Sequence, residues 1–195
     1  MVGVKGQAVL PVVLRGIGFL QMKDLSKANR ALARPTAGVW MRCAMDGCVD
    51  MAEIDAGLAG LARAAAVAAD SAHAPFSRFR VGAALLLDDG SIVTGANYES
   101  ASYGLTMCAE RVAVFRANME GARELVRAVA VIGKSAEGGP GDPVMPCGAC
   151  RQILAELAAA CGRPDMPVVC ADARLRRVRL TTVAELLPHP FTGGV

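Results

Sequence analysis

The run LVRAVAVIG, at residues 125–133, constrains the fold more than any other stretch of this chain. It is almost continuously apolar, which predicts a strand that is buried on both faces. Such a strand needs a layer of structure on each side of its sheet. We therefore expect a central sheet with helices covering both faces.

Helical and strand patterns alternate around this run. Helices are predicted at 51–72, 108–120, 147–162 and 181–187. Strands are predicted at 79–87, 91–99, 125–133, 166–171 and 175–180, the first two joined as a hairpin by the DDG turn. This order predicts an α/β fold, a three-layer α/β/α sandwich around a five-stranded mixed sheet.

Residues 1–50 differ from the rest in charge and pattern. They hold seven Lys and Arg against three Asp and Glu, whereas residues 51–195 hold fourteen against fifteen. We expect an N-terminal extension over 1–50, either flexible or translated from a start assigned too far upstream, and a catalytic domain over 51–195. An organelle presequence is the third interpretation. The near-neutral body lacks a basic footprint for nucleic acid, and no apolar run is long enough for a membrane span.

The chain has seven cysteines, an odd number that does not indicate a disulfide framework. Free or metal-bound thiols in a reducing compartment fit better, so we expect a cytoplasmic protein. The two histidines, His73 and His189, stand in loop-like segments, so neither a histidine triad nor a His-rich metal site is expected. Cys161 and Cys170 are interpreted as small buried apolar residues. Cys43 and Cys48 are interpreted as unpaired thiols.

Three other cysteines stand where helices are predicted to begin. Cys108 opens one helix, and Cys147 and Cys150 open another, three residues apart on one helical face. Helix N-termini favour thiolates. A lone C-x-x-C could be a redox pair, half of a structural zinc site or a coincidence. A third cysteine beside a carboxylate favours a catalytic metal site with three protein ligands and one open position.

Two charged residues follow Cys108 within the same turn. Glu110 could carry protons to and from a water at the open position. Three thiolates on a dipositive metal leave one negative charge, and the guanidinium of Arg111 could offset it. The ordinary alternative for Arg111 is an exposed helix residue in a surface ion pair.

CAE at 108–110 followed by PCGAC at 146–150 matches the zinc nucleobase-deaminase signature in its three-cysteine form. FSRFRVGAAL, GANYESASYGLTMCAERVA, PCGACRQIL and ELLPHPF occur in this order, and with them the chain resembles the homotetrameric class of cytidine deaminases over residues 52–192. The resemblance implies a cytidine deaminase-like fold and one Zn²⁺ per subunit on Cys108, Cys147 and Cys150. It also implies hydrolytic deamination of cytidine and deoxycytidine to uridine and deoxyuridine, with release of ammonia, in pyrimidine salvage.

The resemblance also implies roles for individual residues. Zinc-bound hydroxide would attack ring carbon 4 of the base while Glu110 shuttles the protons. Asn97 and Glu99 would bind the ribose hydroxyls, and Phe79 would pack against the pyrimidine. The remaining implied contacts are the backbone of Ala109 on the polar edge of the base and the ring of Phe191, which would close the pocket from a neighbouring subunit of a homotetramer. Tyr98 and Ser100 depart from the family pattern, which bears on fine substrate preference.

Four alternatives stay open. The nearest is a deaminase of the same fold that acts on a blasticidin-type nucleoside antibiotic. A polynucleotide deaminase would need a positively charged channel for its strand. A non-catalytic structural zinc module would hold metal without turnover. A dithiol oxidoreductase would form a reversible disulfide between Cys147 and Cys150.

Overall fold

A single mixed sheet runs through the computed structural model, which describes residues 47–135 and 142–193. Its strands, in the order in which they are hydrogen-bonded, are β1 (Val49–Asp50), β6 (Arg177–Thr182), β5 (Pro167–Ala171), β4 (Val126–Ser135), β2 (Phe79–Leu87) and β3 (Ile92–Ala96). β4 and β5 are parallel, and every other neighbouring pair is antiparallel. The mixed sheet is as predicted. The expected five strands are one too few, because the two-residue β1 pairs with β6 through Val49 and Val178.

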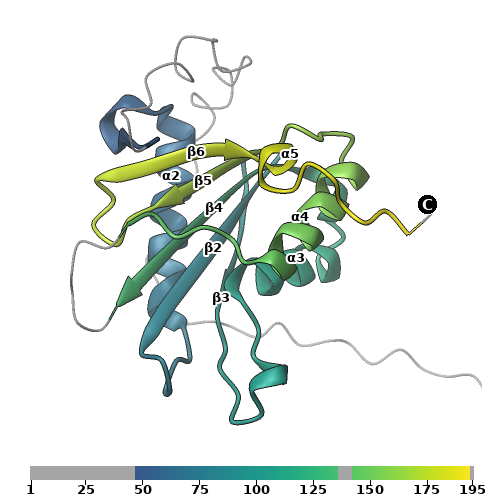
Figure 1. Cartoon of the computed structure of the whole chain (residues 1–195). Coiled ribbons are helices and arrows are strands. Elements are labelled where there is room, and N and C mark those ends of the chain that lie inside the picture. Colours follow the sequence, from purple (N-terminus) through teal and green to yellow (C-terminus); the bar gives the residue numbers. More distant parts are fainter. Residues whose placement is uncertain (1–46, 136–141, 194–195) are drawn as a thin grey trace, which may run out of the picture.

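Helices cover both faces of this sheet (Figure 1). The longer ones are α2 (Ala56–Ala68), α3 (Ala109–Met119) and α4 (Gly148–Ala160), followed by the one-turn α5 (Val183–Leu186). Short 3₁₀ turns lie at η1 (Met51–Glu53), η2 (Ala69–Ser71), η3 (Tyr103–Leu105) and η4 (Arg123–Leu125). α2 packs on one face, and α3 and α4 pack on the other. None of the helices within the described residues is long and apolar enough to cross a membrane.

The alternation of side chains along β2 explains the three layers. Ala83 and Leu85 are buried against α3 and α4, whereas Ala84 and Leu86 are buried against α2. Neighbouring residues of a strand point to opposite faces, so one apolar strand supplies both cores. The apolar run of β4 does the same, which confirms the prediction of a strand buried on both faces.

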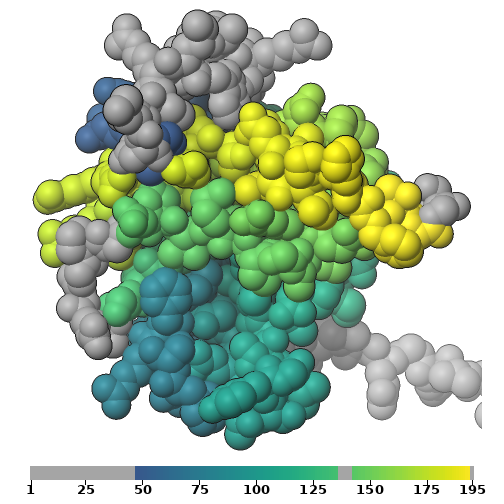
Figure 2. Space-filling model, in the orientation of Figure 1, coloured from purple at the N-terminus to yellow at the C-terminus, as the bar shows by residue number. Residues whose placement is uncertain are grey.

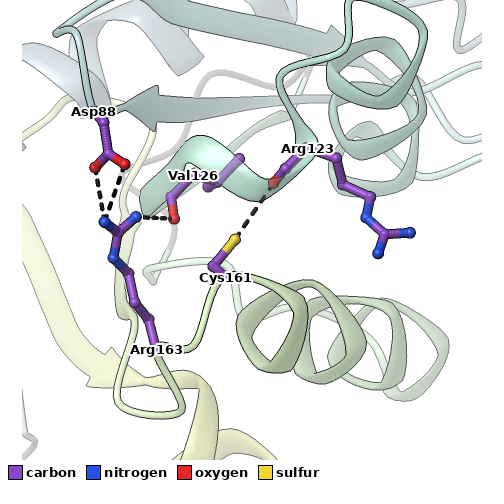
Figure 3. Close-up of polar contacts among 5 residues, drawn as sticks. All are labelled: Asp88, Arg123, Val126, Cys161 and Arg163. Atoms are coloured by element: carbon purple, nitrogen blue, oxygen red, sulfur yellow. Dashed lines mark hydrogen bonds and ion pairs between the residues drawn. The ribbon is translucent and has the colours of Figure 1, made fainter. Parts of the chain in front are cut away.

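The end of α4 is fastened to two distant parts of the chain (Figure 3). Arg163 donates hydrogen bonds to the carboxylate of Asp88 at 2.8 and 3.1 Å and to the carbonyl oxygen of Val126 at 2.8 Å. Cys161 Sγ donates to the carbonyl oxygen of Arg123 at 3.3 Å. These contacts fix α4 against the β2–β3 turn and the start of β4, so the far end of the helix is held in place.

The expected division at residue 50 lies close to the start of the described residues. Cys48 and Val49 are buried, and Val49–Asp50 belongs to the sheet. Residues 1–46, which include Cys43, lie outside the described residues. The N-terminal extension therefore stays a prediction.

Candidate active site

Two helix N-termini meet at the centre of the site. Cys108 is the N-cap of α3 and Cys147 is the N-cap of α4, and neither side chain makes a capping hydrogen bond. Cys150 lies in the first turn of α4 and is buried. The Sγ atoms of Cys108 and Cys147 are 3.8 Å apart, and all three sulfurs lie within 4.8 Å of one another. The structure thus brings together the three cysteines that the sequence singled out.

The sulfur positions fit a zinc ion. With Zn–S bonds of about 2.3 Å, tetrahedral geometry separates two sulfurs by about 3.8 Å, as is found for Cys108 and Cys147. Soft thiolates suit zinc, and the positive ends of two helices favour their ionised form. Across residues 47–135 and 142–193, no other group of three His, Cys, Asp or Glu side chains could hold a metal ion. Three protein ligands would leave the fourth position open.

The thiols of Cys108, Cys147 and Cys150 interact with one another in the absence of metal. A hydrogen bond from the Cys150 thiol, aided by Arg111 and Cys147, lowers the pKa of Cys108 to about 5, although partial burial opposes this. The same hydrogen bond and burial raise the pKa of Cys150. Cys108 therefore ionises before Cys150. Metal binding would then displace the proton that Cys150 keeps.

Glu110 is a buried carboxylic acid next to these sulfurs. It lies in the first turn of α3, and only 4% of it is exposed. Burial, with a smaller contribution from the charge on Cys108, raises the pKa of its carboxyl group. A carboxyl group with a raised pKa can both accept and release a proton near neutral pH. Its interactions with Cys108 and Cys150 place it next to the cluster, where it could transfer protons.

Arg111 turns its guanidinium back over the cysteines. Its Nη2 donates to the carbonyl oxygen of Thr106 at 3.1 Å and makes a longer contact with Cys108 Sγ at 3.8 Å. Its Nε is shut off from solvent and has no hydrogen-bond partner among the described residues. The side chain is thus a cation held against a sulfur, not the exposed surface residue of the ordinary alternative.

A second group of residues forms a cavity of about 480 Å³. It is lined by Phe76, Ser77, Glu99, Tyr103 and Thr106. The carboxylate of Glu99 accepts hydrogen bonds from the backbone N–H groups of Phe76 at 2.8 Å and Ser77 at 3.2 Å, and also from the Ser77 hydroxyl. The Ser77 hydroxyl is the main cause that lowers the pKa of Glu99. Glu99 therefore presents an ionised carboxylate to this cavity.

Asn97 and Phe79 are fixed at the start of β2. Asn97 Oδ1 accepts from the N–H of Val81 at 2.8 Å, and its Nδ2 donates to the carbonyl oxygen of Phe79 at 3.1 Å. The ring of Phe79 lies over Gly133, where a Cβ would come within 2.5 Å of Cζ. An asparagine amide still has one N–H and one lone pair free after these two bonds.

The predicted strand at 91–99 was too long. β3 ends at Ala96, because Tyr98 pairs with Met107 and His73 instead of with β2. Asn97 and Glu99 are thus held by different partners rather than side by side on one strand. Ala109 is the buried first residue of α3, next to Cys108.

Phe191 is not among the residues that line the cavity at Glu99. It lines a groove of about 770 Å³ along α3 and α4, and 77% of it is exposed. The yellow C-terminal segment projects from the edge of the molecule in Figure 2. Within its own chain, Phe191 therefore lines a different hollow from the one that Glu99 lines.

Sequence reasoning missed Ser77, Tyr103 and Thr106. Ser77 and Thr106 stand inside quoted motifs, but their hydroxyls look like ordinary loop polar groups. Tyr103 packs edge-on against Phe76, with ring centroids 5.9 Å apart. The spacing of a short 3₁₀ turn gives no signal for such a contact.

Comparison with known proteins agrees with this geometry. Residues 59–161 match the family model "Cytidine and deoxycytidylate deaminase zinc-binding region". A cytidine deaminase from Halalkalibacterium halodurans is 48% identical over 132 residues, which cover 68% of this chain and 92% of that protein. The crystal structure of cytidine deaminase from Burkholderia pseudomallei superposes with a TM-score of 0.57 at 43% identity, over 68% of this chain and 97% of that one.

A more distant relative carries another name. Blasticidin-S deaminase from Bacillus cereus is 28% identical over 123 residues, which cover 60% of this chain and 79% of that protein. Its identity is well below that of the cytidine deaminases. The fold, the three-cysteine cluster and these matches together show that the chain belongs to the cytidine deaminase family of zinc-binding proteins.

Proposed function

We propose that this protein is a zinc-dependent hydrolase that converts cytidine and deoxycytidine to uridine and deoxyuridine with release of ammonia. The observation that carries the proposal is the buried Glu110 beside three thiols at two helix N-termini. A structural zinc module needs no buried carboxyl group next to an open coordination position. The cytidine deaminase relatives at 43–48% identity supply the substrate class.

Cys108, Cys147 and Cys150 would hold the metal. When bound there, zinc supplies Lewis-acid chemistry by lowering the pKa of a water that can attack ring carbon 4. Glu110 accepts the proton that this water loses and delivers it to ring nitrogen 3. A second proton, again moved by Glu110, converts the amino group into departing ammonia. The sum is one nucleoside and one water giving the deaminated nucleoside and ammonia.

Burial of Glu110 supports this role. A carboxyl group shielded from solvent keeps the raised pKa that lets it act first as a base and then as an acid. Arg111 supports it by placing a positive charge against Cys108. That charge offsets part of the negative charge of three thiolates, which would otherwise make a water bound to the metal less acidic.

The nucleoside would occupy the space between the cysteines and the cavity at Glu99. The ionised Glu99 suits a pair of ribose hydroxyl donors, and Asn97 has one donor and one acceptor position free. Phe79 would pack against the pyrimidine ring, and the backbone of Ala109 would bind its polar edge. Thr106 lines the cavity and accepts from Arg111, so it links the sugar end to the metal end.

We also infer a homotetramer in which a second copy covers the groove along α3 and α4. This groove is lined mainly by apolar side chains, among them Phe115, which is 46% exposed. Met119, the residue after the lining residue Asn118, is 84% exposed. Exposed apolar surface of this extent favours a protein partner over solvent. Phe191 stands at the edge of the groove and would close the pocket of the neighbouring subunit.

The proposed setting is pyrimidine salvage in the cytoplasm. No disulfide joins any of the six cysteines among the described residues, which suits a reducing compartment. A division into an N-terminal extension and a catalytic domain that begins near residue 51 is part of the same proposal, with the short β1 (Val49–Asp50) already paired with β6.

Side-by-side assays with cytidine, deoxycytidine and blasticidin S test the substrate. We expect turnover of both nucleosides, at rates well above any turnover of blasticidin S. Turnover of blasticidin S alone would identify the protein as a deaminase of nucleoside antibiotics instead. Activity only on a single-stranded oligonucleotide would identify a polynucleotide deaminase instead.

A further inference from the structure

One side chain of α4 holds the backbone of Phe191. Gln152 Nε2 donates to the carbonyl oxygen of Phe191 at 2.6 Å, and Gln152 Oε1 accepts from the N–H of Phe191 at 3.1 Å. Gln152 Nε2 also donates to Glu156 Oε1 at 2.9 Å. A backbone N–H can only donate and a carboxylate can only accept, so all three bonds agree on one orientation of the amide. The two bonds to Phe191 fix the residue as a strand partner would.

The ring of Phe191 is left free by the same contact. Its backbone is tied to α4, yet 77% of the residue is exposed. A large exposed aromatic usually gains by folding back onto its own surface. Here the fixed main chain presents the ring at the edge of the groove that also includes Ile153 and Leu157.

The position of Gln152 links this contact to the metal centre. It lies two residues after Cys150 in the first part of α4, whose N-cap is Cys147. Because Gln152 holds the backbone of Phe191, the position of the Phe191 ring is fixed relative to α4, the helix whose N-terminus carries Cys147 and Cys150. A rigid link of this kind lowers the entropy that ordering an aromatic in a pocket would otherwise cost.

We propose that Gln152 is a positioning residue, which holds the backbone of Phe191 so that the ring enters the nucleoside pocket of a second copy of the chain. The inference rests on the proposed function, in which Phe191 closes a neighbour's pocket. Gln152 touches neither substrate nor metal and acts only through Phe191. Each active site is then completed by a residue whose position is set in another subunit.

Steady-state kinetics of Gln152→Met and Gln152→Asn test the inference. Methionine keeps the length of the side chain without its hydrogen bonds, and asparagine keeps the amide but shortens its reach. Each should raise KM for cytidine about 3- to 10-fold, the range expected from losing such hydrogen bonds, and leave kcat within about twofold. Glu53→Met, the same thioether at an exposed site in η1, is the control and should change neither constant.

The double variant decides whether Gln152 acts through Phe191. Phe191→Ala alone should raise KM at least as much as Gln152→Met. Adding Gln152→Met to Phe191→Ala should then raise KM no further, because the group being positioned is gone. Effects that multiply would overturn the inference, as would an unchanged KM in Gln152→Met with intact zinc content.

Amide hydrogen exchange at Phe191 gives a readout that needs no activity. The Phe191 N–H should exchange slowly in the wild-type protein and at least several-fold faster in Gln152→Met. Equal exchange rates in the wild type and in Gln152→Met would show that Gln152 does not hold the backbone of Phe191, even if KM rose. A wild-type protein that fails to deaminate cytidine but protects this amide would contradict the proposed function. The role of Gln152 in catalysis would fall with it, although its contact with Phe191 would stand. If Gln152→Met does not fold, Gln152→Asn supplies the same comparison.

Discussion

The Sγ atoms of Cys108 and Cys147 lie 3.8 Å apart, although 39 residues separate them in the chain. Each sulfur caps a different helix, so the distance depends on how α3 and α4 sit on the sheet. The two helices are brought together by burial against β2, β4 and β5. The metal site is thus a consequence of the core packing.

Replacing a sulfur should remove the zinc. Cys147→Ser and Cys150→Ser lose a soft ligand, and zinc content should fall from about one per subunit to well below one, with loss of turnover. Elemental analysis of the purified protein measures this. Cys161→Ser is the matched control, because that thiol contacts the Arg123 carbonyl at the other end of α4. Zinc lost equally from Cys161→Ser would contradict the assignment of ligands.

Removing the acid should stop the chemistry and spare the metal. Glu110→Gln keeps the shape of the side chain but cannot take up a proton, so kcat should fall about 10²- to 10⁴-fold. Glu120→Gln at the end of α3 loses only an exposed ion pair with Arg116 and should keep wild-type kcat. Full activity in Glu110→Gln would refute the proton shuttle.

The charge on Arg111 should matter to the metal centre. Arg111→Gln removes the cation next to Cys108, and activity or zinc affinity should fall about 10- to 100-fold, as for other groups that support metal ligands. Titration with a zinc chelator and kcat/KM for cytidine measure the two effects. Arg116→Gln removes an exposed charge from the same helix as a control. Equal behaviour of the two variants would reduce Arg111 to a surface residue.

Ser77 should set the pH dependence of sugar binding. Its hydroxyl lowers the pKa of Glu99, so the carboxylate stays ionised as the medium becomes acidic. In Ser77→Ala the pKa rises toward its ordinary value, and KM should begin to increase at a higher pH than in the wild type. The Ser91–Asp89 pair has the same chemistry in the β2–β3 turn, so Ser91→Ala should leave the KM profile unchanged. Identical dependence of KM on pH in Ser77→Ala and the wild type would show that ionisation of Glu99 does not affect substrate binding.

Gly95 allows α3 to approach β3. A Cβ there would lie 2.4 Å from the N of Ala113 and 2.5 Å from the O of Ala109, so the helix carrying Glu110 would have to move. Gly95→Ala should cost about 1–3 kcal/mol of unfolding free energy, as overpacking does, and should lower activity as well. Gly60→Ala in α2 meets nothing within 4 Å and should stabilise by about 0.5–1 kcal/mol. Urea denaturation gives both values, and a neutral Gly95→Ala would contradict the close packing.

Much of the fold could be predicted from local patterns. The strand at 79–87 agrees residue for residue with β2, because its apolar character and the DDG turn are both local signals. β1 could not be predicted, since Val49–Asp50 is too short to show a period and is defined only by its pairing with β6. The same holds for the end of β3, where Tyr98 finds partners in Met107 and His73.

The site divides in the same way. The three cysteines, Glu110 and Arg111 could be predicted, because thiols and a carboxylate at the starts of predicted helices indicate a metal site. The hydrogen bonds of Glu99 to Ser77 and of Gln152 to Phe191 span 22 and 39 residues. No spacing rule connects such pairs, so they required the structure.

The decisive measurement is the loss of ultraviolet absorbance when zinc-loaded protein is mixed with cytidine. We expect steady turnover to uridine in the wild type, and turnover lower by about 10²- to 10⁴-fold in Glu110→Gln with equal zinc content. No turnover by wild-type protein that holds one zinc per subunit would contradict the proposed function and leave a structural metal site.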